Sequence, residues 1–492
     1  MRKLIVLSKS LFLVSYLLLC TSIPVQAQKN LSGSAEIQLS LEKLQVVGNV
    51  LMIAAHPDDE NTALLAWLAK SRKYRTAYLS LTRGEGGQNL IGSEQGDLMG
   101  VIRTQELLAA RRIDGAEQYF TRAIDFGFTK TATETLTKWD RKLVLGDVVY
   151  TIRRFRPDVI ILIFSGTPRD GHGQHQASSI LGREAFRAAA DPNQFPEQLK
   201  LGVEPWQAKR LLLNLPSYTA EMEKQSAATP NTLMVDTGSF DPLLGVSYAE
   251  IAGMSRSQHR SQAMGFPERK GTQKGYLLLQ DGEPASKDLF DGIETGWSRV
   301  TGAGKVAGAL ARAQNMFEPR YPEKIVPMLL EARQALAAID EFHAKQKLRE
   351  LDELIAKASG LYLEAASDRY QAIPGKSMKV NASAIVRSDV KVEFDQVSVP
   401  ALSMEKQPAR PLENNVVAKI ELEASIPAST PFTQPYWLRA PKQGDMYGIN
   451  DLRDLDAPEN QPLTAMFKVK VEGQELTLTD RKSTRLNSSH RH

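Results

Sequence analysis

Five residues that could take part in metal-assisted hydrolysis fall in two short motifs. An apolar run ends in the string AHPDDE, which contains His56, Asp58 and Asp59, and a later string, GHGQHQ, contains His172 and His175. An imidazole and two carboxylates in one turn can hold a divalent cation and still leave one carboxylate free as a base. The alternative is structural, because capping and the helix dipole alone favour acidic residues at a helix start.

The spacing of the two downstream histidines favours the metal-binding interpretation. His172 and His175 are three positions apart, which brings both rings to one face of a helical turn. The chain has seven histidines; two of them lie among its last three residues, and His343 lies in a predicted helix. The remaining four are His56, His172, His175 and His259, and chance clustering is the alternative to a shared site.

The segments around these motifs predict an α/β fold. Residues 46–55, 74–81 and 158–165 are apolar runs typical of strands buried on both faces, and a helical pattern follows the first of them over residues 61–70. We therefore predict a domain over residues 34–285 that has a mainly parallel sheet with helices on both faces. Both motifs then lie at the carboxyl ends of strands, where such sheets bind ligands.

Two further regions are predicted downstream. Residues 286–373 read as a connector and a helical region, in which residues 321–370 form a helical hairpin. Residues 374–479 alternate apolar and polar side chains between proline clusters, which predicts a C-terminal β-sandwich-like region. Residues 480–492 resemble the translation of a sequencing adapter, so we expect an artefactual tail after a truncated β-rich domain; a natural basic tail is the alternative.

The first 27 residues have the pattern of a secretory signal peptide. A basic start leads into a short apolar core, and Val25-Gln26-Ala27 fits a cleavage site, so we expect a secreted or periplasmic protein. The apolar core is too short to span a bilayer, and we expect no transmembrane segment in the mature chain. Cys20 is the single cysteine and lies in the removed segment, so a metal site must use histidine, aspartate or glutamate.

The net charge of +4 does not indicate a nucleic-acid partner. The excess of basic over acidic residues lies in the first 27 and the last 13 residues, and the chain between them is close to neutral. A basic footprint on the folded part is what nucleic-acid binding requires, so we predict none. The oligomeric state is not indicated by any feature of the sequence.

The motifs together resemble those of the PIG-L/LmbE family of zinc-dependent N-acetylglucosaminyl deacetylases. AHPDDE followed by HxxH carries the resemblance, and the strings TRGEGG and RTQELLAA are similar to the family's intervening motifs. The resemblance covers about residues 46–281 and implies a Rossmann-like fold. It also implies a substrate that is an N-acetylated sugar or glycoconjugate.

The resemblance assigns roles to the five residues by motif position. His56, Asp59 and His175 are implied as ligands of one Zn²⁺ per chain, with Fe²⁺ also possible for such ligands. Asp58 is implied as the general base and His172 as the partner of the reacting carbonyl. Many relatives have an aspartate where this chain has Gln174, which bears on the orientation of the ligands rather than on the metal.

The chemistry of these residue types agrees with those roles. Three protein ligands leave an open position for water, whose pKa a metal lowers towards about 7. Asp58 could take the proton of this water, and a protonated His172 could stabilise the oxyanion and protonate the departing amine. We expect Arg103, Arg83 and His259 to contact the substrate; surface or capping charges, and a core histidine, are the ordinary alternatives.

We therefore predict a secreted metal-dependent deacetylase that hydrolyses the N-acetyl amide of a GlcNAc-type amino sugar. The same activation of water would serve another metal-dependent amidase or N-acyl hydrolase, which is the second hypothesis. A non-catalytic carbohydrate-binding cell-surface protein is the third. Metal analysis distinguishes the two enzyme hypotheses from the binding protein. A bound ion that is lost in the His56→Ala variant would indicate a metal site that includes His56.

Overall fold

The computed structural model describes residues 33–263, 265–369, 371–460 and 464–480. The predicted signal peptide and nearly all of the predicted artefactual tail lie outside these residues. In the described part of the chain, every helix is too short or too polar to cross a membrane.

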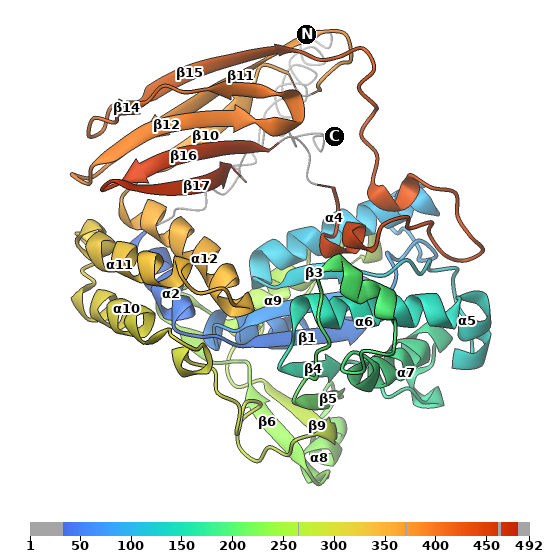
Figure 1. Cartoon of the computed structure of the whole chain (residues 1–492). Helices are drawn as coiled ribbons and strands as arrows, with labels where there is room; N and C mark the ends of the chain where they lie inside the picture. The colour runs from blue at the N-terminus through green and yellow to red at the C-terminus, as the bar shows by residue number, and fades with distance from the viewer. Residues whose placement is uncertain (1–32, 264, 370, 461–463, 481–492) are drawn as a thin grey trace, which may run out of the picture.

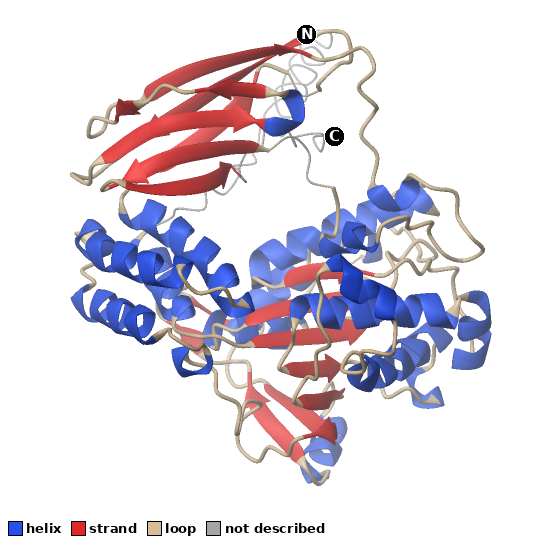
Figure 2. Cartoon of the chain, in the orientation of Figure 1, coloured by secondary structure: helices blue, strands red, loops and turns tan. Residues whose placement is uncertain are grey.

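A seven-stranded sheet forms the centre of the N-terminal part (Figures 1 and 2). Five neighbouring strands are parallel, and β9 pairs antiparallel with both β5 and β6. The prediction of a mainly parallel sheet is therefore confirmed. In spatial order the strands are β3 (Glu117–Phe120), β2 (Arg75–Ser80), β1 (Asn49–Ala54), β4 (Val159–Leu162), β5 (Arg210–Leu215), β9 (Lys274–Gly282) and β6 (Thr232–Asp236).

Strand β1 shows why this sheet is covered on both faces. All six of its residues are buried, and alternate side chains enter two different cores. Leu51 and Ile53 pack with helices α6 (Arg141–Phe155) and α7 (Gly173–Ala188). Val50 and Met52 pack into the second core, on the opposite face. Its helices are α3 (Thr62–Ala66), the π-helix η1 (Trp67–Ser71), α4 (Asp97–Asp114) and α9 (Tyr248–Arg256).

Four helices form a layer between the α/β part and the C-terminal strands (Figure 1). They are α2 (Ser34–Leu44), α10 (Gly304–Met316), α11 (Val326–Ala337) and α12 (Phe342–Ala358). The two helices predicted as a hairpin, α11 and α12, lie in this layer together with α2 and α10. The helical pattern predicted to reach residue 370 ends earlier, because Gly360 adopts a left-handed φ of 63° after the last turn. Residues Tyr362–Ser367 form strand β10 instead.

The C-terminal strands form two antiparallel sheets that share one core with the helical layer. Strand β11 is typical, since its alternate residues Met378, Val380 and Ala382 point into this core. One sheet contains β10, β11 (Ser377–Ile385) and β15 (Ala418–Ser425). The other contains β12 (Val392–Val399), β13 (Met404–Lys406), β14 (Arg410–Pro411), β16 (Ala465–Val471) and β17 (Gln474–Asp480).

The chain leaves these sheets between β15 and β16 and crosses to the α/β part, as the orange-red segment in Figure 1 shows. We call residues 427–460 the crossing segment. Its Met446 pairs with Ala123 in an isolated β-bridge, and Tyr447 N donates to the Arg122 carbonyl over 2.8 Å. The sequence analysis placed this segment inside the β-rich domain, whereas its buried aromatic side chains pack beside α6.

Candidate metal and catalytic site

The turn after β1 is held in an unusual backbone conformation. Asp58 has a φ of 94°, which is rare for a residue other than glycine and is found most often at functional sites. The backbone N–H of Asp58 donates to Glu60 Oε2 over 2.9 Å, and the backbone N–H of His56 donates to Asp59 Oδ2 over 2.7 Å. Tyr78 also donates to the His56 carbonyl over 2.5 Å. These bonds fix the directions of the Asp58 and Asp59 side chains.

The fold brings the two predicted motifs together. Because β1 and β4 are parallel neighbours, the turn after β1 and the segment between β4 and α7 lie at the same edge of the sheet. The ring centroids of His56 and His175 are 5.1 Å apart, and those of His172 and His175 are 4.9 Å apart. His56 and His172 stack at 5.1 Å between centroids.

The donor atoms of His56, Asp59 and His175 have the geometry of a metal site. All three ligand atoms lie within 4.8 Å of one another. His56 Nδ1 is 3.1 Å from Asp59 Oδ2, and His175 Nε2 is 3.5 Å from Asp59 Oδ1. Two ligands bound at about 2.1 Å in a tetrahedral arrangement are separated by about 3.4 Å, so these gaps fit a cation such as Zn²⁺.

In both imidazoles, the ring nitrogen that faces away from Asp59 makes a hydrogen bond, and the nitrogen that faces Asp59 can bind a metal. His56 Nε2 lies 2.9 Å from Gln174 Oε1, an acceptor, so Nε2 carries a proton, and in the neutral ring the lone pair is on Nδ1, which faces Asp59. His175 Nδ1 lies 3.1 Å from the Asp170 carbonyl, so Nε2 is free in the same way. Metal-binding histidines commonly donate their other N–H to an acceptor. The residues present therefore fit a divalent cation.

The charges around the ligands favour an ionised carboxylate. Burial would raise the pKa of Asp59, but His56 and His175 outweigh it and hold that pKa well below its usual range. Burial would lower the pKa of His56, but Asp59 and Asp125 raise it to about 9. The cluster thus places negative charge where a cation would bind, and a bound cation would replace the proton that His56 otherwise attracts.

Asp58 is not one of the three clustered ligands and pairs with Arg103. The Arg103 guanidinium donates to Asp58 Oδ1 over 2.8 Å and also donates to the Pro57 carbonyl. Burial raises the pKa of Asp58, and Arg103 opposes that rise. Among the described residues, Asp58 Oδ2 accepts no hydrogen bond, so this oxygen is available to a water.

His172 caps the N-terminus of α7. Its Nδ1 accepts from the Gln174 backbone N–H over 3.3 Å, which leaves the ring proton on Nε2. Burial and the neighbouring rings of His56 and His175 lower the pKa of His172 to about 4. This environment favours the neutral ring with its proton on Nε2, whereas the sequence analysis expected a protonated His172; the role of His172 stays a prediction.

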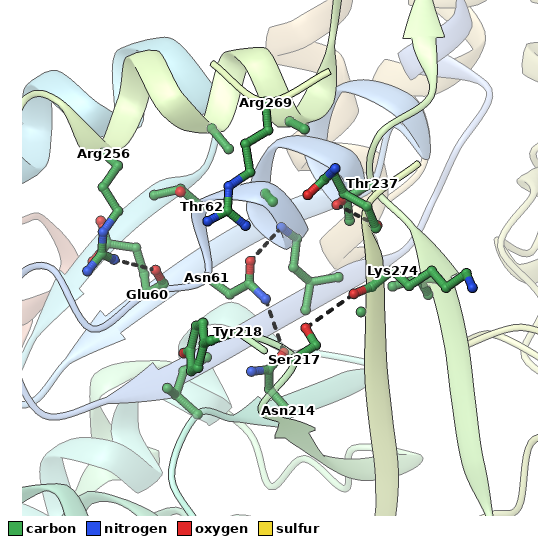
Figure 3. A pocket seen from close by; sticks show the side chains of 18 of the residues that line it. Glu60, Asn61, Thr62, Asn214, Ser217, Tyr218, Thr237, Arg256, Arg269 and Lys274 are labelled. Atoms are coloured by element: carbon green, nitrogen blue, oxygen red, sulfur yellow. Dashed lines mark hydrogen bonds between the residues drawn. The ribbon is translucent and has the colours of Figure 1, made fainter. Parts of the chain in front are cut away.

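A cavity of about 740 Å³ opens beside the cluster and is lined at one end by Asp58, Asp59 and His175. Figure 3 shows its polar wall, in which Asn61 donates to Asn214 over 3.1 Å and the Arg269 side chain extends toward Asn61. Phe164 stacks on the His175 ring at 3.9 Å between centroids and also lines the cavity. A volume and lining of this kind suit a small polar ligand such as a sugar.

The three residues predicted to contact the substrate do not line this cavity. Arg103 is 3% exposed and contacts Asp58 instead. Arg83 is fully buried, where it donates to Tyr436 Oη over 2.7 Å and lies 3.4 Å from the Trp437 ring centroid. His259 is also fully buried, with Nε2 2.9 Å from Glu60 Oε1. Because both side chains are fully buried away from the cavity, the predicted sugar contacts of Arg83 and His259 are wrong.

Three residues that organise the site have no role in the predictions from the sequence. Gln174 was noted only as a departure from the family pattern, yet it binds both His56 and Asp125. Glu60 belongs to the AHPDDE string and accepts from Asp58, Arg111 and His259. Asp125 lies in a segment with no distinguishing pattern, so no sequence signal could have identified it.

Comparison with known proteins agrees with this geometry. Residues 51–186 match the family described as GlcNAc-PI de-N-acetylase, or PIG-L. Over these residues the chain is similar to the PIG-L family. The matched residues include His56, Asp58, Asp59, His172 and His175.

Two curated relatives of the PIG-L domain are deacetylases. The chain is 30% identical over 166 residues to diacetylchitobiose deacetylase of Thermococcus kodakarensis, covering 33% of this chain and 58% of that protein. It is 28% identical over 179 residues to 1D-myo-inositol 2-acetamido-2-deoxy-alpha-D-glucopyranoside deacetylase 2 of Saccharopolyspora erythraea, covering 33% and 63%. The chain thus spans about three fifths of the length of these relatives.

Among solved structures, the N,N'-diacetylchitobiose deacetylase of Pyrococcus horikoshii is similar with a TM-score of 0.32 and 20% identity. That similarity covers 44% of this chain and 71% of that one.

Proposed function

We propose that this chain is a metal-dependent deacetylase that hydrolyses the N-acetyl amide of a GlcNAc-type amino sugar. The observation that carries the proposal is the convergence of His56, Asp59 and His175, with an unliganded Asp58 beside them at the end of a sugar-sized cavity. The PIG-L match and the two deacetylase relatives support the same reaction.

His56 Nδ1, Asp59 and His175 Nε2 would hold the cation, and we propose Zn²⁺, with Fe²⁺ as the alternative that these ligands also suit. When bound, the cation supplies Lewis acidity toward a water and toward the amide carbonyl. Gln174 and the Asp170 carbonyl orient the two imidazoles before binding, so little reorganisation is required.

Asp58 acts as the general base in this proposal. Arg103 occupies Oδ1, which leaves Oδ2 to take a proton from the attacking water. The water oxygen forms a bond to the carbonyl carbon, and the neutral His172 donates from Nε2 to the developing oxyanion. The C–N bond then breaks, and the proton held by Asp58 passes to the amine nitrogen, so that acetate and a free amino sugar are released.

The experiment is acetate release from a panel of N-acetylated sugars by the zinc-loaded full chain. We expect turnover that is abolished by Asp58→Asn with the bound metal retained, and abolished by His56→Ala with the metal lost. Hydrolysis of N-acyl amino acids or peptides, with no hydrolysis of acetylated sugars, would instead establish the second enzyme hypothesis. Failure of the wild-type chain to bind about one divalent ion per chain would end both proposals.

We also propose that the protein is exported, because residues 1–27 have the pattern of a cleaved signal peptide. Sequencing the N-terminus of the protein after expression in a bacterial host tests this. The expected mature chain begins after Ala27, and an intact N-terminus in the cytoplasmic fraction would contradict export.

A further inference from the structure

The crossing segment packs buried aromatic side chains against the α/β part. Tyr436 and Trp437 enclose the Arg83 guanidinium, which also donates to the Pro458 carbonyl over 3.0 Å. Tyr447 is 1% exposed, and its hydroxyl donates to Glu85 Oε1 over 2.6 Å. Arg83 and Glu85 both belong to the TRGEGG string, so one loop receives both tyrosines of the crossing segment.

A series of hydrogen bonds connects Glu85 to His56, a predicted metal ligand. Glu85 Oε2 accepts from the backbone N–H of Asp125 over 3.0 Å. Asp125 Oδ1 accepts from Gln174 Nε2 over 3.1 Å, and Gln174 Oε1 lies 2.9 Å from His56 Nε2. Each of these contacts is buried, so water does not compete for the groups involved.

The orientation of the Gln174 amide is the decisive step in this chain of contacts. Its nitrogen faces two acceptors, Asp125 Oδ1 and the Gly127 carbonyl, so its oxygen must face His56. An oxygen at that position keeps the proton of His56 on Nε2 and leaves Nδ1 free. If Asp125 moved, the amide could rotate and present a donor to His56, which would favour the wrong tautomer.

We propose that Tyr447 is a positioning residue for the metal site, acting on His56 through Glu85, Asp125 and Gln174. The inference rests on the proposed metal site and goes beyond it, because it makes a residue more than 300 positions downstream part of the catalytic machinery. Glu85 is the group on which Tyr447 acts: burial raises the pKa of Glu85, and the bond from Tyr447 opposes that rise.

Tyr447→Phe and Tyr436→Phe form a matched pair of variants for the test. Both remove one buried hydroxyl from the crossing segment, and each hydroxyl bonds one residue of the same loop. Only Tyr447 connects to His56. The measurement is the zinc dissociation constant of the full chain, obtained by competition with a chromophoric chelator, together with the melting temperature of the zinc-free chain.

We expect Tyr447→Phe to weaken zinc binding about tenfold, at the lower end of the effect of outer hydrogen-bond partners. Tyr436→Phe should lower the melting temperature to a similar extent and change zinc binding less than about twofold. Gln174→Ala should weaken binding by about 10- to 100-fold. In the Gln174→Ala background, Tyr447→Phe should have no further effect, because its route to His56 is already broken.

The outcomes separate this inference from the proposed function. Equal zinc affinities for the two tyrosine variants would overturn the role of Tyr447, even if the wild-type chain binds zinc and releases acetate. Additive effects of Tyr447→Phe and Gln174→Ala would overturn the proposed route through Gln174. A wild-type chain that binds no zinc would instead refute the metal site itself.

Discussion

Replacing Glu60 by glutamine tests how much of the site depends on one buried carboxylate. Glu60 is 1% exposed and accepts from His259 Nε2 at 2.9 Å, from Arg111 Nη2 at 3.1 Å and from the strained Asp58 backbone at 2.9 Å. Burial alone would raise its pKa, but His259 and Arg111 lower it from 4.5 to about 2.

The size of this shift gives the expected loss of stability. A lowering of the pKa from 4.5 to about 2, at about 1.4 kcal/mol per pKa unit, corresponds to about 3 to 4 kcal/mol for the ionised form of Glu60. Because the folded-state pKa lies below the unfolded value, this stability is present above about pH 4.5 and is lost as the pH falls toward 2. Glu60→Gln should therefore be destabilised by about 3 to 4 kcal/mol at pH 7 and by much less near pH 2.

Urea unfolding followed by tryptophan fluorescence measures the difference between the two chains at each pH. The matched control is Glu223→Gln, because Glu223 also lines the cavity but has a side chain that is 40% exposed and pairs with Lys274 at 3.5 Å. We expect the control to change stability by less than about 1 kcal/mol. A Glu60→Gln chain as stable as wild type at pH 7, or a deficit that persists unchanged at pH 2, would refute the reasoning.

Three further predictions concern the neighbouring residues. Arg103→Met removes the cation that opposes the raised pKa of Asp58. The acidic limb of the pH–rate profile should therefore move to higher pH, and kcat should fall at neutral pH. A change in KM alone would instead indicate that Arg103 contacts the substrate. His172→Ala should lower kcat by about 100- to 1,000-fold with zinc binding retained, and a loss of zinc in metal analysis would contradict a role in oxyanion stabilisation. Gly86→Ala places a Cβ 2.3 Å from the Gly127 backbone nitrogen and 2.7 Å from Asp125 Oδ1. It should therefore lower the free energy of unfolding in urea by about 1–3 kcal/mol and weaken zinc binding. An unchanged stability and an unchanged zinc affinity would contradict the close packing of this loop.

The sequence predicted the parts of the site that depend on local pattern. The all-buried strand β1 could be identified because five consecutive apolar residues, 50–54, precede AHPDDE, and parallel pairing with β4 then placed His172 and His175 opposite His56. The helix end at Gly360 also had a local signal, which the longer apolar periodicity outweighed.

The remaining features depend on contacts between distant residues. Arg83 follows a strand end in a glycine-rich turn, which is also where a ligand-binding arginine would lie, and only its burial under Tyr436 and Trp437 distinguishes the two cases. His259 likewise pairs with a carboxylate 199 positions away. The aromatic residues of the crossing segment have no periodicity that would indicate a partner outside the β-rich region.

Because of the crossing segment, the α/β part is not made from one continuous stretch of the chain. The chain enters the α/β part between α2 and β1, leaves it after β9, returns after β15 and leaves again before β16. Three of these connections lie in the part that the structure describes: between α2 and β1, after β9 and after β15. A protease that cleaves any one of these three leaves the other two intact, so a nicked molecule would still migrate as one particle until denaturant separated its fragments.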